Sequence, residues 1–339
     1  MHAGRRFTFS EVVHWTRRDI FLFVALSTIP VLLYEVFGFE WIKLPWLPIA
    51  LVGTAIAFLI GFKNNASYDR MWEARKIWGA IVNSSRSWGL MARDFITNDY
   101  ATTPLSEPEL AEIRKRLIYR HIAWLTALRY QLRQPKEWEA MHMKHNAEYG
   151  RNFSVPELLT NIDDELRKHL SESETTYVLS KSNRATAILG LQSQDLRDIS
   201  TKRYFDEFRH MEMQTMLTDL FTQQGKCERI KNFPFPRQYA TINGLLVWIF
   251  VLLVPFGMVY EFAKFGGHFV WMSIPFSALV CWVFNLMERV GEVTEHPFQA
   301  GPADIPMTAL SRTIEIDLRQ LLDETETPPP IGAERSILM

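Results

Sequence analysis

The sequence predicts an all-α membrane protein with four transmembrane helices and a large cytosolic helical section. Residues 44–62 form an uncharged run that is long enough to cross a bilayer core. The 11 Trp and 23 Phe residues suit the aromatic belts of membrane interfaces. The long polar section in the middle of the chain shows almost no alternation of period two, so we expect helices there and no sheet.

We divide the 339 residues into four parts, because apolar residues concentrate in blocks near the two ends of the chain. Residues 1–62 are expected to hold an N-terminal amphipathic helix and transmembrane helices 1 and 2. Residues 63–238 are expected to form the cytosolic helical section. Transmembrane helices 3 and 4 are assigned to residues 239–290, and a C-terminal cytosolic segment to residues 291–339.

The N-terminal part begins with a pattern typical of a membrane-surface helix at residues 7–19, where Trp15 precedes two arginines. The uncharged run at residues 20–34 is short for a span, and the residues that follow can lengthen it. Pro30 lies inside this run and predicts a kink, which neighbouring helices can tolerate by satisfying the freed carbonyl.

The stretch at residues 44–75 starts as a membrane-type helix and ends as a charged, water-facing one. No helix breaker lies between Pro48 and Arg75, so we expect one continuous helix. Gly53, Ala57 and Gly61 recur every four residues and form a stripe of small side chains. Such a stripe lets neighbouring helices approach closely in lipid, which predicts helix packing along it.

A second stripe on the same helix consists of Thr54, Phe58 and Phe62, about 100° round from the first. One interpretation is that these side chains only pack, facing lipid or core, as aromatic stripes at helical spacing usually do. The other interpretation is that they line a narrow apolar constriction on the axis of an oligomer. The spacing alone leaves both interpretations open.

The polar section shows clear helix boundaries. Ser106 and Glu109 fit a capping box for a helix over about residues 108–132. Another helix is predicted over residues 202–224, with Gly225 as its C-terminal stop. After the prolines that follow, residues 239–260 and 265–287 read as two further spans, with His268 near the start of the second.

Charges near the ends of the spans set the orientation. Basic residues gather before the first span and after the second, whereas each short hairpin turn between spans carries a single lysine beside a glutamate. The positive-inside rule then places both termini and the 63–238 section in the cytoplasm. The basic residues are Arg5, Arg6, Arg17 and Arg18 before the first span, Lys63, Arg70, Arg75 and Lys76 after the second, and Lys43 and Lys264 in the turns.

Several functional classes find no support. The net charge of −1 argues against a nucleic-acid partner, and two isolated cysteines, Cys227 and Cys281, give no disulfide framework. There is no Gly-rich phosphate loop, nucleophile elbow or HExxH motif. His142 and His145 are spaced three apart, but nothing nearby completes a metal site. We therefore expect no enzyme activity, no cofactor and no metal.

Three stretches carry a resemblance to a known family. They are GTAIAFLIGFKNNASYDRMWEARKIWG at residues 53–79, CERIKNFPFPRQYA at 227–240 and ERVGEVTEHPFQAGPADIPMTALSRTIEIDLRQLL at 288–322. They are similar to the neck helix, to the elbow before the third span, and to the segment after the last span of the bestrophins. Together with the order of the spans, the chain resembles a bacterial bestrophin to about residue 325.

This resemblance implies a homopentameric ion channel in the bacterial inner membrane, with a single pore on the five-fold axis. By position, Thr54, Phe58 and Phe62 would line the neck, although Thr54 departs from the bulky apolar residue usual there. Ile188, within RATAILGLQ, would form a second constriction at the cytosolic end. The acids in EHPFQAGPADIP are too scattered for the oxygen cage that calcium requires, so we expect no calcium gating.

The expected activity is passive conduction of chloride or other small monovalent anions across the lipid bilayer. Phenylalanine rings can attract an anion with their edges or a cation with their faces, and the sequence does not say which points inward. A cation-selective channel for sodium or potassium is therefore the first alternative. The second is a membrane-anchored helical scaffold or enzyme, which would need a polar catalytic cluster within residues 63–238.

Overall fold

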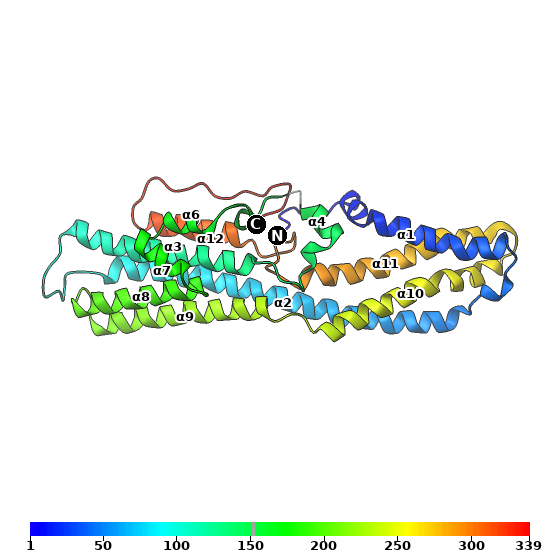
Figure 1. The fold of residues 1–339 in the computed structure, drawn as a ribbon, viewed down its shortest axis with the longest axis horizontal. Coiled ribbons are helices and arrows are strands. Elements are labelled where there is room, and N and C mark those ends of the chain that lie inside the picture. The colour runs from blue at the N-terminus through cyan, green and yellow to red at the C-terminus, as the bar shows by residue number, and fades with distance from the viewer. Residues whose placement is uncertain (151–152) are drawn as a thin grey trace.

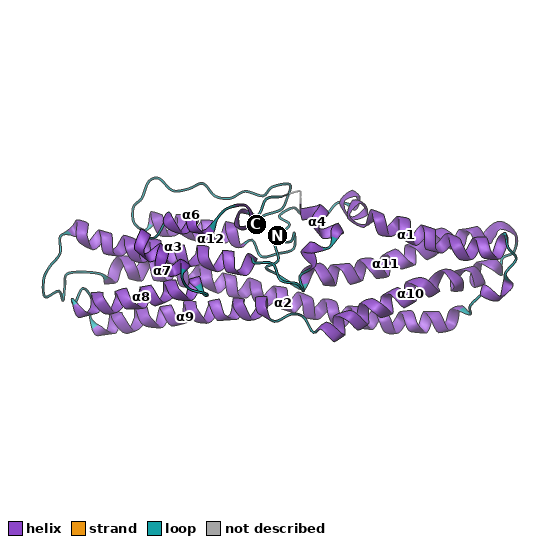
Figure 2. Ribbon diagram, in the orientation of Figure 1, coloured by secondary structure: helices purple, strands orange, loops and turns teal. Residues whose placement is uncertain are grey.

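The computed structural model describes residues 1–150 and 153–339, and the chain forms a long molecule built from helices (Figure 1). Figure 2 shows helices joined by loops, with no strand within those described ranges. The two termini lie near the middle of the long axis. The prediction of an all-α fold is confirmed.

The longest element is α2, Trp46–Phe95, a single helix of 50 residues that runs through both halves of the molecule. Its length is about 75 Å at 1.5 Å per residue. The prediction of one continuous helix over residues 48–75 is confirmed. It crosses the expected domain boundary at residue 62 without a break, so one rigid element joins the apolar and the polar parts of the chain.

The apolar half of the molecule consists of α1 (Phe9–Glu35), the first part of α2, α10 (Arg237–Ala263) and α11 (Ser273–Thr294). Within the described residues, three helical segments are long and apolar enough to cross a membrane: Glu40–Phe95, Arg237–Ala263 and Gly267–Thr294. The fourth helix, α1, lies along α11 and α10 in the same half.

The N-terminal amphipathic helix and the first apolar run form one helix instead of two. Thr8 caps α1, accepting a hydrogen bond from the backbone N–H of Glu11, whose carboxylate in turn accepts from the Thr8 backbone N–H. Pro30 lies inside α1 without ending it. This continuity follows from the absence of any breaker between residues 9 and 29.

The polar half is organised around α3 (Glu107–Arg133), α8 (Arg184–Thr201) and α9 (Glu207–Asn232). Helices α3 and α9 pack against the second part of α2, and α8 packs against α3 and α9. Helix α12 (Met307–Gln320) covers α2 and α3. The capping box of Ser106 and Glu109 is confirmed at the start of α3. The short helices are α4 (Lys144–Gly150), α5 (Pro156–Leu159), α6 (Ile162–Arg167) and α7 (Glu172–Leu179).

The predicted helix stop at Gly225 is wrong, because α9 continues to Asn232. The turns beyond Gly225 place Cys227 and Ile230 in the core. Burial of these side chains outweighs the cost of a mid-helix glycine, which is about 1 kcal/mol relative to alanine.

A tryptophan-rich core holds the polar half together. Trp78 and Trp88 of α2 and Trp124 of α3 are fully buried. His121 lies among them: its Nε2 is 2.9 Å from the hydroxyl of Ser85, and its ring centroid is 5.1 Å from that of Trp124. Burial lowers the pKa of His121 from 6.5 to about 3, so the imidazole stays neutral in the folded protein at pH 5.

Acidification should therefore destabilise the polar half through His121. The unfolded chain binds a proton below about pH 6.5 and the folded chain only near pH 3, so this contribution is complete above pH 6.5 and declines as the pH falls. Between pH 7 and pH 5 the loss is about 2 kcal/mol. The His121→Gln variant keeps a hydrogen-bonding side chain that does not titrate. Its free energy of unfolding should therefore fall less between pH 7 and pH 5. Equal pH dependence of the free energy of unfolding in both proteins would contradict this assignment.

Candidate pore-lining helix

The first part of α2 has one face packed inside the protomer and one face exposed. Ile56 and Ile60 are buried against the neighbouring helices. Phe58 and Phe62 lie on the other face and are 66% and 63% exposed. Thr54 is exposed on the same face. The interpretation that these side chains pack in the core of their own protomer is thus excluded. They face lipid, another copy of the chain or the axis of a pore.

The rotation of α2 is set by a buried charge directly after Phe62. Lys63 is only 2% exposed, and its ammonium group pairs with Glu288 of α11. Glu288 also accepts a hydrogen bond from Asn243 of α10. The next residue, Asn64, donates to the carbonyl of Met287 at 3.1 Å. These contacts tie α2 to α10 and α11, and so hold both phenylalanines on the outer face.

Thr54 is less polar at the surface than its residue type suggests. Its hydroxyl donates to the carbonyl of Ala50, one turn earlier, at 2.9 Å. A threonine that bonds back to its own helix leaves its methyl group to face outward. The exposed stripe of Thr54, Phe58 and Phe62 is therefore apolar along its whole length.

The stripe of small residues divides between two roles. Gly53 is buried against α10, where an added Cβ would lie 2.6 Å from a ring carbon of Phe250. Ala57 is half-buried. At Gly61 an added Cβ would meet nothing within 4 Å. Gly53 thus permits close packing within the chain, whereas Gly61 is open to contacts from outside it.

Substitution of these two glycines should separate the two roles. Gly53→Ala forces Phe250 to move and should cost about 1–3 kcal/mol of stability. Gly61→Ala meets no atom of its own chain and should leave the fold intact or slightly more stable. Thermal unfolding of the purified protein checks both. Equal destabilisation by the two variants would show that Gly61 also lies at a tight interface.

The assignment of Ile188 to a second constriction is contradicted by its burial. Ile188 is 0% exposed in α8, within the same core as Trp124. A side chain that faces the core of its own protomer does not line an opening between copies. Of its two neighbours, Leu189 is buried as well and Ala187 is half-buried. Sequence similarity matched this segment to the family's second constriction. The direction in which each side chain points depends on how α8 packs against α3 and α9.

The acidic segment after α11 holds an ion pair. Asp304 is buried, pairs with Arg133 of α3 at 2.5 Å, and accepts a hydrogen bond from the Ala300 backbone N–H at 2.7 Å. Burial raises the pKa of Asp304, and the Arg133 guanidinium opposes that shift. Among the described residues, no three His, Cys, Asp or Glu side chains are arranged to hold a metal. The side chains of His142 and His145 lie outside that description.

Comparison with known proteins identifies the family. The profile of the bacterial and fungal bestrophin proteins matches residues 6–320. The chain belongs to the bestrophin family. A match of this length covers the apolar half, the polar half and α12 together, so the resemblance of the three sequence stretches extends to the whole architecture.

Relatives and solved structures agree with that assignment. The chain is 29% identical over 296 residues to the voltage-dependent anion channel-forming protein YneE of Escherichia coli K12, covering 87% of this chain and 82% of that one. It is 28% identical to the voltage-dependent anion channel-forming protein RSc3414 of Ralstonia nicotianae, covering 86% and 81%. It also matches the crystal structure of a bacterial bestrophin homolog from Klebsiella pneumoniae, with a TM-score of 0.73, 25% identity and coverage of 91% and 98%.

Proposed function

We propose that this bestrophin is a passive anion channel that forms a pentamer around one axial pore in the bacterial inner membrane. Thr54, Phe58 and Phe62 of each chain line the neck of that pore. One observation carries this assignment: an apolar stripe is exposed on α2, and the buried Lys63 directly after Phe62 fixes the rotation of the helix so that the stripe stays exposed. Side chains held outward in this way are available to a symmetry axis.

The ion class is inferred from the relatives, since those from Escherichia coli and Ralstonia nicotianae are both described as anion channel-forming. Chloride is the proposed physiological ion because it is an abundant small anion. Phenylalanine edges carry the positive part of the ring quadrupole and suit an anion when they point inward. A reversal potential measured under a salt gradient separates this from the cation-selective alternative.

The channel assignment also replaces the enzyme and scaffold alternatives. Family membership and the names of the relatives support conduction, and neither supports a catalytic site. Ion flux into liposomes that contain only the purified protein, with no substrate added, would distinguish a channel from a scaffold or an enzyme.

We further propose four spans, with α1 as the first and both termini cytoplasmic. The position of α1 along α10 and α11 supports its role as a span, and the excess of Arg and Lys at the polar ends supports the orientation.

Cysteine labelling should confirm this topology. The native Cys227 and Cys281 are both buried, and burial raises the pKa of the Cys227 thiol, so background reaction should be low. In intact cells a membrane-impermeant maleimide should label Glu40→Cys, between α1 and α2, but not Thr102→Cys, between α2 and α3. Permeabilised cells should show labelling of both. Labelling of Thr102→Cys in intact cells would reverse the orientation.

Widening the neck should raise conductance. An ion among apolar rings loses hydration without gaining ligands, so the rings impose a barrier. Replacing Phe58 and Phe62 together by alanine removes the two largest side chains of the stripe and should raise single-channel conductance. Because both side chains are exposed in the protomer, the fold should be retained.

The oligomer provides the control for this experiment. Native mass spectrometry should show five chains for the unaltered protein and for the Phe58→Ala, Phe62→Ala double variant. Unchanged conductance in a correctly assembled double variant would remove the neck assignment. A mostly monomeric or dimeric unaltered protein would remove the pentamer.

A further inference from the structure

The exposed face of α2 continues past the neck without a change of direction. Because the helix is unbroken, Phe62, Asn65 and Asp69 all lie within about 40° of Phe58 around it. Asn65 and Asp69 are exposed, as the two phenylalanines are. Asp69 lies seven residues beyond Phe62, which is about 10 Å along the helix. Asp69 therefore points in the same direction as Phe58 and Phe62, but it lies in the polar half of the molecule.

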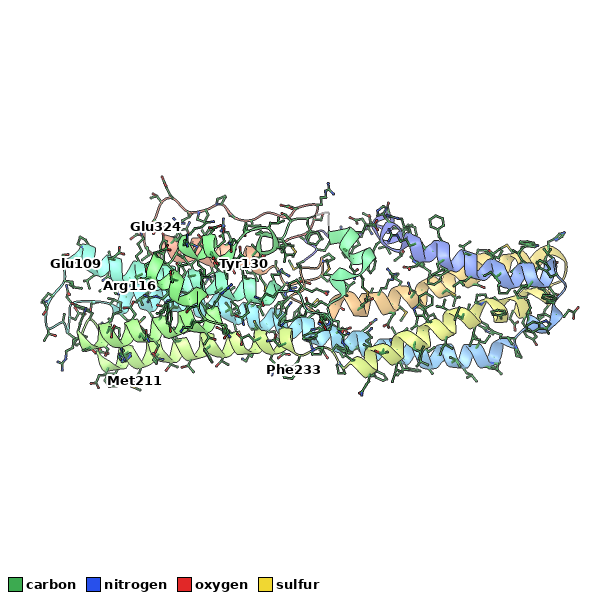
Figure 3. All side chains as sticks on the ribbon, in the orientation of Figure 1. Glu109, Arg116, Tyr130, Met211, Phe233 and Glu324 are labelled. Carbon is green, nitrogen blue, oxygen red and sulfur yellow. The ribbon has the colours of Figure 1, made fainter. Side chains whose placement is uncertain are left out.

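Three other charged residues of α2 near this point are engaged by their own protomer. Lys63 pairs with Glu288, Glu73 with Arg229, and the Arg70 guanidinium donates to the carbonyls of Ile230 and Phe233. These contacts bind α2 to α11, to α9 and to the linker that follows α9. Figure 3 labels Phe233 on this linker, at the lower edge of the view, where the polar half meets the apolar half.

Asp69 has no such contact. It makes no hydrogen bond or ion pair with the part of the chain that the structure describes. Asp69 is thus the unpaired charge nearest to Phe62 on the outer face of α2.

We propose that Asp69 forms a ring of five carboxylates on the cytosolic side of the neck, and that this ring makes anion conduction asymmetric. The proposal rests on the pentamer and the neck described above. Five negative charges around one axis lower the local concentration of anions there. Anions that arrive from the cytosol meet the ring before the neck, whereas anions from outside meet it after the barrier.

A second charge on this face acts in the opposite sense but from farther away. Lys76 lies seven residues beyond Asp69, is also exposed, and faces the same direction as Phe58. It is about 20 Å from Phe62 along the helix, whereas the Debye length at physiological ionic strength is about 8 Å. Screening therefore leaves Asp69 as the dominant charge at the cytosolic end of the neck.

The test compares Asp69→Asn with Asp94→Asn in planar bilayers. Asp94 lies on the same helix and is exposed, but it is 25 residues farther along, and it pairs with Arg93 at 2.6 Å. The measurement is the ratio of the chloride current carried from the cytosolic side to that carried from the outer side, in about 30 mM and about 1 M salt. Asp69→Asn should raise this ratio on the order of tenfold in low salt, and the effect should vanish in 1 M salt, where the Debye length is about 3 Å.

Charge reversal extends the test. Asp69→Lys should raise the ratio further than Asp69→Asn, because five positive charges then concentrate anions at the same place. A ratio that stays the same in both Asp69 variants, or that changes equally in Asp94→Asn, would overturn the proposal. Failure of the neck is recognised separately, because it leaves conductance unchanged in the Phe58 and Phe62 double variant.

Discussion

The rotation of α2 about its own axis decides which of its side chains are buried in the protomer and which are exposed. It is fixed where Lys63, nearly fully buried, meets Glu288 of α11, which also binds Asn243 of α10. Removing one partner of a buried ion pair costs about 3–5 kcal/mol, because the other charge is left without compensation. A helix held this firmly at one residue keeps every other residue of its 50 in a defined direction.

Two opposite surfaces follow from this single anchor. On the inner side, Gly53 allows Phe250 of α10 to approach, and the isoleucines of α2 fill the apolar core. On the outer side, apolar side chains in the apolar half give way to Asn65 and Asp69 in the polar half. In the proposed pore, the same helix would therefore offer an ion an apolar segment and then a charged one, with no loop between the two segments.

The polar half supports this arrangement through its core. Fully buried tryptophans from α2 and α3 share one core with residues of α8, α9 and α12, and this core holds the second part of α2 in place. Where the two halves meet, Lys63 and Glu73 of α2 are ion-paired within the protomer, and Arg70 donates to backbone carbonyls. In the proposed pore, the charges of α2 that have no partner in their own chain would be the ones to act on a permeating ion.

The sequence was enough to predict the helical class, the unbroken helix α2, the capping box of α3 and the family, because these depend on local spacing, on helix breakers and on contiguous motifs. It did not determine which side of a helix is buried. Ile188 belongs to the core, Gly53 packs within its own chain, and α9 passes Gly225 to bury Cys227 and Ile230. These outcomes depend on contacts between segments far apart in the chain, and such contacts are settled only when the helices pack together.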